Sequence, residues 1–150
     1  MAEVKKLKVK DIPKVLKLSI VIFKPDKEMK DKFHSTEKWT ENYSKDGVLL
    51  GAFVDGKLAG FLFAYRNDLD KKSFHVWMCG IDQKYRRQGI MKLLMERAFQ
   101  HAKNEEYKKV TINTIKEKFP AMYSFITNYG FEKFKKEENK SLFRKKLEIV

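Results

Sequence analysis

The sequence predicts an α/β (α+β) fold: a central mixed sheet, mostly antiparallel with one parallel strand pair, flanked by about four helices. The first observation is the Asp55-Gly56 pair between two apolar runs, the strongest short-range signal of a β-hairpin. The second is a strand-helix-strand order over 73–81, 89–104 and 109–115, which makes a right-handed parallel crossover. The third is size, because 150 residues with 43% hydrophobic content fit a single domain (1–150) with a true core.

The N-terminal part predicts a strand followed by two helical stretches. Residues 3–9 alternate loosely between apolar and polar and are expected to form the first strand. Asp11 is expected to cap the next helix, with Pro13 in its first turn, and the helix ends before Pro25. Residues 27–43 predict a polar, weakly amphipathic helix in one piece or two. Its aromatic side chains either line a substrate cleft or pack onto the sheet; they are Phe33, Trp39 and Tyr43.

Three antiparallel strands are expected next, at 48–54, 57–66 and 73–81. The helix 89–104 then presents one apolar stripe, because its apolar residues recur every four positions. These residues are Ile90, Leu94, Ala98 and Ala102. The rest of the chain therefore organises around the loop between strand 73–81 and this helix.

The C-terminal part predicts a strand, a short helix and a hairpin. After strand 109–115, Pro120 opens the helix at its first position and Gly130 ends it as a left-handed cap. The runs 131–135 and 141–149 are expected to pair as the final hairpin, whose edge is free to pair with a second chain. A monomer and a homodimer both stay open.

Composition excludes several classes of protein. The net charge of +13 attracts polyanions, so coenzyme A, nucleic acid and a plain lysine-rich solvated surface are the three explanations. Because no apolar run of about 18 residues exists, we expect no membrane partner. The single cysteine excludes an internal disulfide and favours a cytoplasmic location. Cys79 has no Cys or His at metal-ligand spacing, so we expect no metal.

The loop before helix 89–104 is basic and contains one glycine. A helix start exposes N–H groups that lack intrahelical partners, and the helix dipole adds positive potential there. Gly89 lets a ligand approach the backbone closely, since it has no Cβ. The sequence contains neither a P-loop nor a dinucleotide-binding glycine pattern. The loop is therefore either an anion site of another kind or an ordinary strand-to-helix turn.

The segment Ile81-Asp82-x-x-Tyr85-Arg86-Arg87-Gln88-Gly89-Ile90-Met91-x-x-Leu94 resembles the acetyl-CoA motif of the GCN5-related N-acetyltransferase (GNAT) superfamily. Arg86 and Gly89 match the motif, whereas Met91 stands where the family has a small residue and Gln83 replaces a common Pro. The order β-α-α-β-β-β-α-β-α-β-β is also that family's order, and Tyr129-Gly130-Phe131 resembles the Gly-Phe after its last helix.

The resemblance implies acetyl-CoA as co-substrate, held mainly by backbone atoms. N–H groups between Arg86 and Lys92 would hold the pyrophosphate, and the backbone around Gly80 would pair with the pantetheine arm. The implied cofactor-binding residues are Cys79, Gly80, Ile81, Arg86, Arg87, Gln88, Gly89, Ile90, Met91 and Lys92.

The resemblance does not supply the catalytic side chains. The family's usual acidic Tyr falls at Ile126 and its usual Asn at Phe119. Tyr123, one turn before Ile126, is the substitute acid or else a packing residue. His75 is the candidate base because of its intrinsic pKa, or else a structural histidine.

Two further expectations concern the strand that carries His75. By the two-residue period of a strand, His75 and Trp77 should share one face with Cys79. No His–Asp spacing supports activation of Cys79 as a nucleophile, so direct transfer is expected.

The sequence therefore predicts an acetyl-CoA-dependent N-acetyltransferase acting on a primary amine of a small molecule or a peptide. The alternative is a non-catalytic module of the same fold, whose basic surface binds nucleic acid or CoA. Nucleic acid is disfavoured as a partner, because the basic residues show no cluster beyond Lys84, Arg86 and Arg87.

Overall fold

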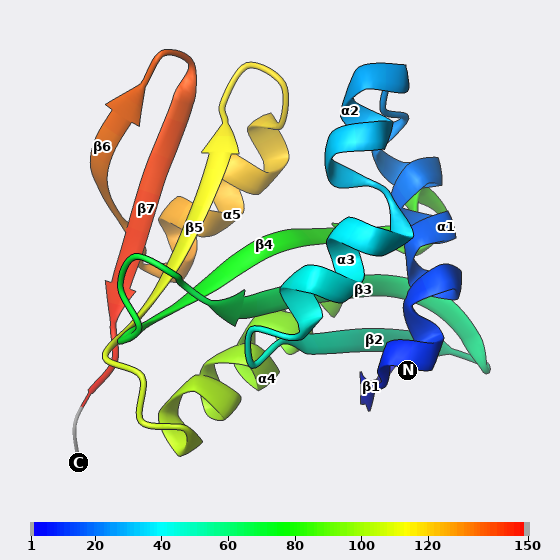
Figure 1. Cartoon of the computed structure of the whole chain (residues 1–150), viewed down its shortest axis with the longest axis horizontal. Coiled ribbons are helices and arrows are strands. Elements are labelled where there is room, and N and C mark those ends of the chain that lie inside the picture. Colours follow the sequence, from blue (N-terminus) through cyan, green and yellow to red (C-terminus); the bar gives the residue numbers. More distant parts are fainter. Residues whose placement is uncertain (1, 149–150) are drawn as a thin grey trace.

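The computed structural model describes residues 2–148, which form one seven-stranded sheet with helices on both faces (Figure 1). The strand order is β1-β2-β3-β4-β5-β7-β6, and only β4 and β5 run parallel. The strands are β1 (Ala2–Leu7), β2 (Val48–Val54), β3 (Lys57–Arg66), β4 (Ser73–Ile81), β5 (Lys109–Ile115), β6 (Glu132–Glu137) and β7 (Lys140–Lys146). The helices are α1 (Ile12–Phe23), α2 (Lys27–Phe33), α3 (Thr36–Tyr43), α4 (Ile90–Asn104) and α5 (Pro120–Tyr129). The predicted fold class, with its one parallel pair, is confirmed.

The hairpin and the crossover form as predicted. Asp55 and Gly56 have φ values of 50° and 78°, so both central residues of the β2–β3 turn are left-handed, as a type I′ turn requires. The α4 helix joins β4 to β5, which pair in parallel from Ser73–Lys109 to Val76–Ile112. Gly130 caps α5 with a φ of 106°, in the left-handed region that favours glycine.

The N-terminal elements differ in two details. The first strand ends at Leu7, because Val9–Asp11 forms a turn of 3₁₀ helix. Asp11 precedes α1 as expected, but its carboxylate accepts a hydrogen bond from the Lys8 N–H (2.8 Å) rather than from the helix. The predicted role of Asp11 as a side-chain cap is therefore wrong.

The stretch 27–43 forms two helices. Asp26 caps α2 by accepting from the Met29 N–H, and Ser35 caps α3 by accepting from the Lys38 N–H. Serine strongly favours such a position, and it starts a new helix rather than continuing the old one. The final hairpin is also shifted, since β6 extends to Glu137 and β7 ends at Lys146. The predicted end of that strand, Ile149, lies outside the described residues.

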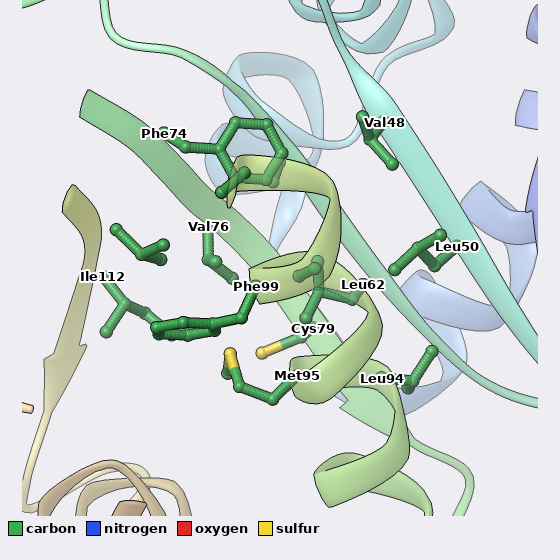
Figure 2. Packing of buried hydrophobic residues seen from close by; sticks show 14 of the residues in the cluster. Val48, Leu50, Leu62, Phe74, Val76, Cys79, Leu94, Met95, Phe99 and Ile112 are labelled. Carbon is green, nitrogen blue, oxygen red and sulfur yellow. The ribbon is translucent and has the colours of Figure 1, made fainter. Parts of the chain in front are cut away.

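Two apolar clusters lie on opposite faces of the sheet. The larger one packs α4 and α5 against the strands and includes Leu94, Phe99 and Ile126 (Figure 2). The other packs α1 and α3 against the opposite face and is built around Trp39, which is fully buried against Phe61 and other rings. The structure therefore places Trp39 on the sheet rather than in a cleft. No helix within residues 2–148 is long and apolar enough to cross a membrane.

A β-bulge interrupts β4 at Trp77. On β3, the neighbouring residues Phe63 and Ala64 pair with Met78 and Val76 of β4. Trp77, which lies between Val76 and Met78, has no partner on β3 and is the extra residue of the bulge. As a result Val76 and Cys79 both belong to the α4 side of the sheet, whereas Trp77 and Met78 pack on the α1 side. The expectation that Cys79 shares a face with His75 and Trp77 is wrong, because the extra residue breaks the two-residue period.

Candidate functional site

The strands β4 and β5 diverge beyond the bulge. Their last parallel pair is Val76–Ile112, although β4 continues to Ile81 and β5 to Ile115 (Figure 1). The β5-facing edge of Trp77–Ile81 is thus without a strand partner among the described residues. Backbone donors and acceptors on such an edge need partners, and an extended ligand can supply them.

Gly80 lies on this unpaired edge, beneath the end of α1. A Cβ built at Gly80 would lie 3.2 Å from Ile22 Cγ2 and 3.4 Å from Phe23 Cζ. A Cβ here would require the Ile22 side chain to shift by a few tenths of an ångström. Glycine therefore brings the end of α1 directly over the backbone that the sequence analysis assigned to the pantetheine arm.

The loop between β4 and α4 is braced by its own side chains. Asp82 accepts from the Lys84 N–H (3.1 Å), and Arg86 Nε donates to the Ile81 carbonyl (3.1 Å). Arg86 therefore shapes the loop. The expected role of this segment in anion binding through main-chain N–H groups stays a prediction.

The loop ends in two left-handed residues. Arg87 has a φ of 63° and Gly89, the N-cap of α4, a φ of 75°. No side chain caps α4, so its first N–H groups are free of side-chain partners. A Cβ at Gly89 would meet nothing within 4 Å, so the space beside the helix start is open. Oriented N–H groups next to open space are a suitable site for an anion.

Met91 does not obstruct this space. Its side chain is half-buried and packs against the larger apolar cluster. Its effect on coenzyme A binding stays a prediction.

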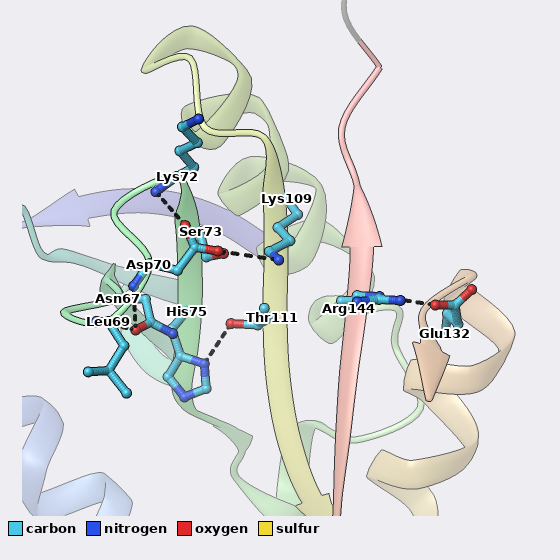
Figure 3. Close-up of polar contacts among 10 residues, drawn as sticks. All are labelled: Asn67, Leu69, Asp70, Lys72, Ser73, His75, Lys109, Thr111, Glu132 and Arg144. Atoms are coloured by element: carbon cyan, nitrogen blue, oxygen red, sulfur yellow. Dashed lines mark hydrogen bonds and ion pairs between the residues drawn. The ribbon is translucent and has the colours of Figure 1, made fainter. Parts of the chain in front are cut away.

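His75 lies in the paired half of β4, away from the loop. Its Nδ1 is 2.9 Å from Thr111 Oγ1 on β5 (Figure 3). Its ring lies edge-on to the ring of Tyr65. Burial, helped by the charge of Lys140, lowers the pKa of His75 to about 4. Gly80 lies five positions further along the strand, which is about 16 Å along an extended chain. These contacts favour a structural histidine, and its role as base stays a prediction.

Tyr123 faces the terminal hairpin. Its hydroxyl accepts from Lys133 Nζ on β6 (3.3 Å), and its ring lies edge-on to Phe143 on β7. Lys116 Nζ lies 5.1 Å from the centre of the ring. Ile126, at the family's usual Tyr position, is fully buried in the core. The structure does not bring Tyr123 and His75 together, and the role of Tyr123 as acid stays a prediction.

Cys79 is buried on the α4 side, and burial raises its pKa to about 12. At neutral pH the group is a thiol, and the thiolate is the nucleophilic form. This is consistent with transfer that does not pass through Cys79. Among residues 2–148, no group of three or more His, Cys, Asp or Glu is placed to hold a metal ion.

The sequence analysis missed the aromatic contact between Phe23 and Phe119. Phe23 ends α1 and Phe119 directly precedes α5, and their rings meet edge-to-face with centroids 5.8 Å apart. The only signal in the sequence was that Phe119 stands at the position where the family usually has an Asn. Nothing in the sequence around Phe23, nearly one hundred residues earlier, indicates that the two rings are in contact.

Comparison with known proteins agrees with this geometry. A sequence profile described as the acetyltransferase (GNAT) family matches residues 13–131. Comparison with curated protein sequences gave no match.

Solved structures share the fold at low sequence identity. The PaiA N-acetyltransferase from Thermoplasma acidophilum, in complex with coenzyme A, has a TM-score of 0.81 at 17% identity over 98% of this chain and 99% of that chain. A putative GNAT-family acetyltransferase from Desulfovibrio desulfuricans has a TM-score of 0.81 at 11% identity over 97% and 99%. The ribosomal-protein-alanine N-acetyltransferase from Brucella melitensis has a TM-score of 0.76 at 15% identity over 97% and 99%.

Proposed function

The chain belongs to the acetyltransferase (GNAT) family, and from this premise we propose that it transfers the acetyl group of acetyl-CoA directly to a primary amine. One observation carries the proposal. The parallel pairing of β4 and β5 stops at Val76–Ile112, and the unpaired part of β4 leads straight into the open helix start at Gly89. Acetyl-CoA is an extended thioester with an anionic tail, so its thioester arm fits beside the unpaired part of β4 and its phosphates fit at the helix start.

Coenzyme A would lie with its pyrophosphate at the start of α4. The N–H groups from Arg87 to Lys92 would donate to it, aided by the positive end of the helix dipole. The pantetheine arm would extend along Cys79–Ile81 and pair with its backbone as an added strand does. Because both interactions use the main chain, the departures at Gln83 and Met91 leave them intact.

Acetyl transfer needs a polarised thioester carbonyl, a neutral amine and a proton for the leaving thiolate. A main-chain N–H near Cys79 or Gly80 would polarise the thioester carbonyl. The neutral amine would attack the carbonyl carbon, forming the C–N bond and giving up one proton to a base or to water, and the C–S bond would then break. The leaving thiolate would take a proton from Tyr123, if that side chain turns from Lys133, or otherwise from Tyr129 or water.

The acceptor would approach from the side of α1 and α2. Ile22, Phe23 and Phe119 give this approach an apolar lining, and all three are half-buried. A small amine or the amine of a peptide would enter between α2 and the diverging ends of β4 and β5. In the cell we place the reaction in the cytoplasm, on the cysteine content alone.

A screen of primary amines with acetyl-CoA, following release of the free thiol, tests the proposal. At least one amine should give thiol release in proportion to enzyme, with the acetylated product seen by mass spectrometry. The rival, a non-catalytic basic module, predicts no turnover on any amine. It predicts instead nucleic-acid binding that weakens steeply with salt.

A further inference from the structure

A buried histidine on the α1 side of the sheet has no part in the chemistry described so far. His34 caps the C-terminus of α2 and is only 7% exposed. Its Nδ1 lies 3.4 Å from the hydroxyl of Ser19, which is fully buried on α1. The same hydroxyl lies 4.0 Å from the sulfur of Met78, the residue after the bulge in β4. His34 is thus linked through Ser19 to the point where β4 and β5 diverge.

The backbone around His34 is held firmly. The His34 N–H donates to the Lys30 carbonyl (2.9 Å), which closes the last turn of α2. The preceding carbonyl, of Phe33, accepts from Trp39 Nε1 (2.9 Å), and Trp39 is fully buried in the core. A catalytic ring needs this kind of support from rigid elements.

Phe23 places the histidine close to the predicted thioester. The ring of Phe23 lies 6.0 Å from the His34 ring, and its Cζ lies 3.4 Å from the Cβ position of Gly80. One phenyl ring therefore separates His34 from the backbone assigned to the acetyl group. This is the side from which the acceptor would approach.

The contact with Ser19 fits one tautomer of His34. When the Ser19 hydroxyl donates its proton to the Met78 sulfur, its oxygen accepts from the Nδ1–H of His34. A neutral imidazole protonated at Nδ1 carries its free lone pair on Nε2. Burial lowers the pKa of His34, and no charged side chain contributes to the shift. Ser19 and Phe23, which contact the ring, are both uncharged.

Resting on acetyl transfer as proposed above, we propose that His34 is the general base of this enzyme. Nε2 accepts the proton that the amine nitrogen gives up as the C–N bond forms. The C–S bond breaks in the same reaction, and coenzyme A leaves as the free thiol after taking a proton from the donor. Ser19 orients the ring, and the Phe23 ring flanks it on the side of Gly80.

An electrophilic analogue, bromoacetyl-CoA, tests the position of His34 without any acceptor. If Nε2 faces the acyl group, it displaces bromide and a carboxymethyl-type adduct forms on His34, which peptide mass spectrometry locates. His34→Gln should abolish this adduct, while a variant of His101, the histidine near the C-terminal end of α4 that contacts Lys6, should be labelled as the parent is (His101→Gln). Labelling elsewhere, or none at His34 although calorimetry shows that acetyl-CoA binds, overturns the inference. Absence of acetyl-CoA binding overturns the proposed function itself, so the two failures are distinguishable.

Kinetics on an acceptor from the screen test the proton transfer. His34→Gln should lower kcat about 10²-fold, the usual size for loss of a general base, with little change in acetyl-CoA affinity. The acid limb of the kcat profile should disappear in that variant, and His34→Asn should behave alike. Ser19→Ala should keep the limb but shift its midpoint, because it frees the ring. If the pH profile of kcat is the same in His34→Gln as in the parent protein, His34 is not the general base.

Discussion

The rings of Phe23 and Phe119 join two segments that no strand pairing joins. Phe23 lies over the unpaired end of β4, Phe119 lies beyond the end of β5, and the rings meet at 5.8 Å. The contact spans the divergence of the strands on the side of α1. Any acceptor that reaches an acetyl group beside Gly80 from that side must pass these rings.

Gly89→Trp should abolish acetyl-CoA binding while the protein remains folded. The Cβ at this position points into open space, so the indole fills the proposed phosphate site. Gly89→Ala is the matched control, because it carries the same strain from a φ of 75° without the bulk. Calorimetry should show clear binding for the Ala variant and none for the Trp variant. Equal affinities in the Trp variant and the parent would place the site elsewhere.

Arg87→Gly should stabilise the protein by roughly 0.5–1 kcal/mol, since it relieves a left-handed residue. Acetyl-CoA affinity should change little if the loop binds through its main chain. Arg97→Gly, at an exposed position inside α4, should destabilise by about 1 kcal/mol. Urea unfolding monitors stability and calorimetry monitors affinity. A large loss of affinity in Arg87→Gly would instead assign the phosphate contact to the guanidinium.

Tyr123→Phe should lower kcat about 10²-fold, as expected for loss of a general acid, with acetyl-CoA affinity retained. Folding should be nearly unaffected, because the hydroxyl has one contact, with the exposed Lys133. Tyr129→Phe is the comparison variant on the same helix. Steady-state kinetics decide between them. An unchanged kcat in Tyr123→Phe removes this residue and leaves Tyr129 or water as the donor.

Cys79→Ala should remain active, because burial keeps the thiol protonated at neutral pH and no acyl-enzyme forms. Rapid mixing with acetyl-CoA alone should give no burst of free coenzyme A. The variant loses packing in the core, so its activity is compared at a temperature where both proteins are folded. A burst in the parent that is missing from Cys79→Ala would replace direct transfer with a covalent intermediate.

Stability should fall as the pH drops from 6.5 towards 4, in part through His75. Its pKa is about 4 in the folded protein and 6.5 in a model side chain, so only the unfolded chain binds a proton in that window. Proton uptake on unfolding lowers the free energy of unfolding. His75→Gln should flatten this part of the curve, measured by urea unfolding between pH 7 and pH 4. A parallel slope in the variant assigns the effect to other groups.

Most of the fold could be predicted from the sequence because its signals are local. Alternation, the Asp55-Gly56 turn and the glycine caps each act within a few residues, and they place β2 to β5 correctly. The break between α2 and α3 was left open, because a polar stretch has little periodicity. The bulge at Trp77 was missed, since nothing in an apolar aromatic run shows where one residue is extra.

The candidate site divides in the same way. The loop at Gly89 could be proposed as a binding site from the sequence because the role expected of it depends on backbone geometry at a helix start. His34, Ser19 and Phe23 were missed, since their meaning comes from contacts between different elements. A lone histidine in a lysine-rich helix has no pattern of its own. Only the packing of α1 and α2 over β4 brings it near the expected chemistry.

The extra residue in β4 also sets a boundary for how the protein can change. Before Trp77, a substitution is answered by β5 and by the core under α4, where space is closed. After it, side chains of the strand still pack under α4 and against α1, but the edge that would face β5 has no strand partner among the described residues. A ligand can therefore use that edge without altering the pairing of β4 with β5. The inserted residue at Trp77 thus separates the half of β4 that completes the sheet from the half whose backbone edge is open.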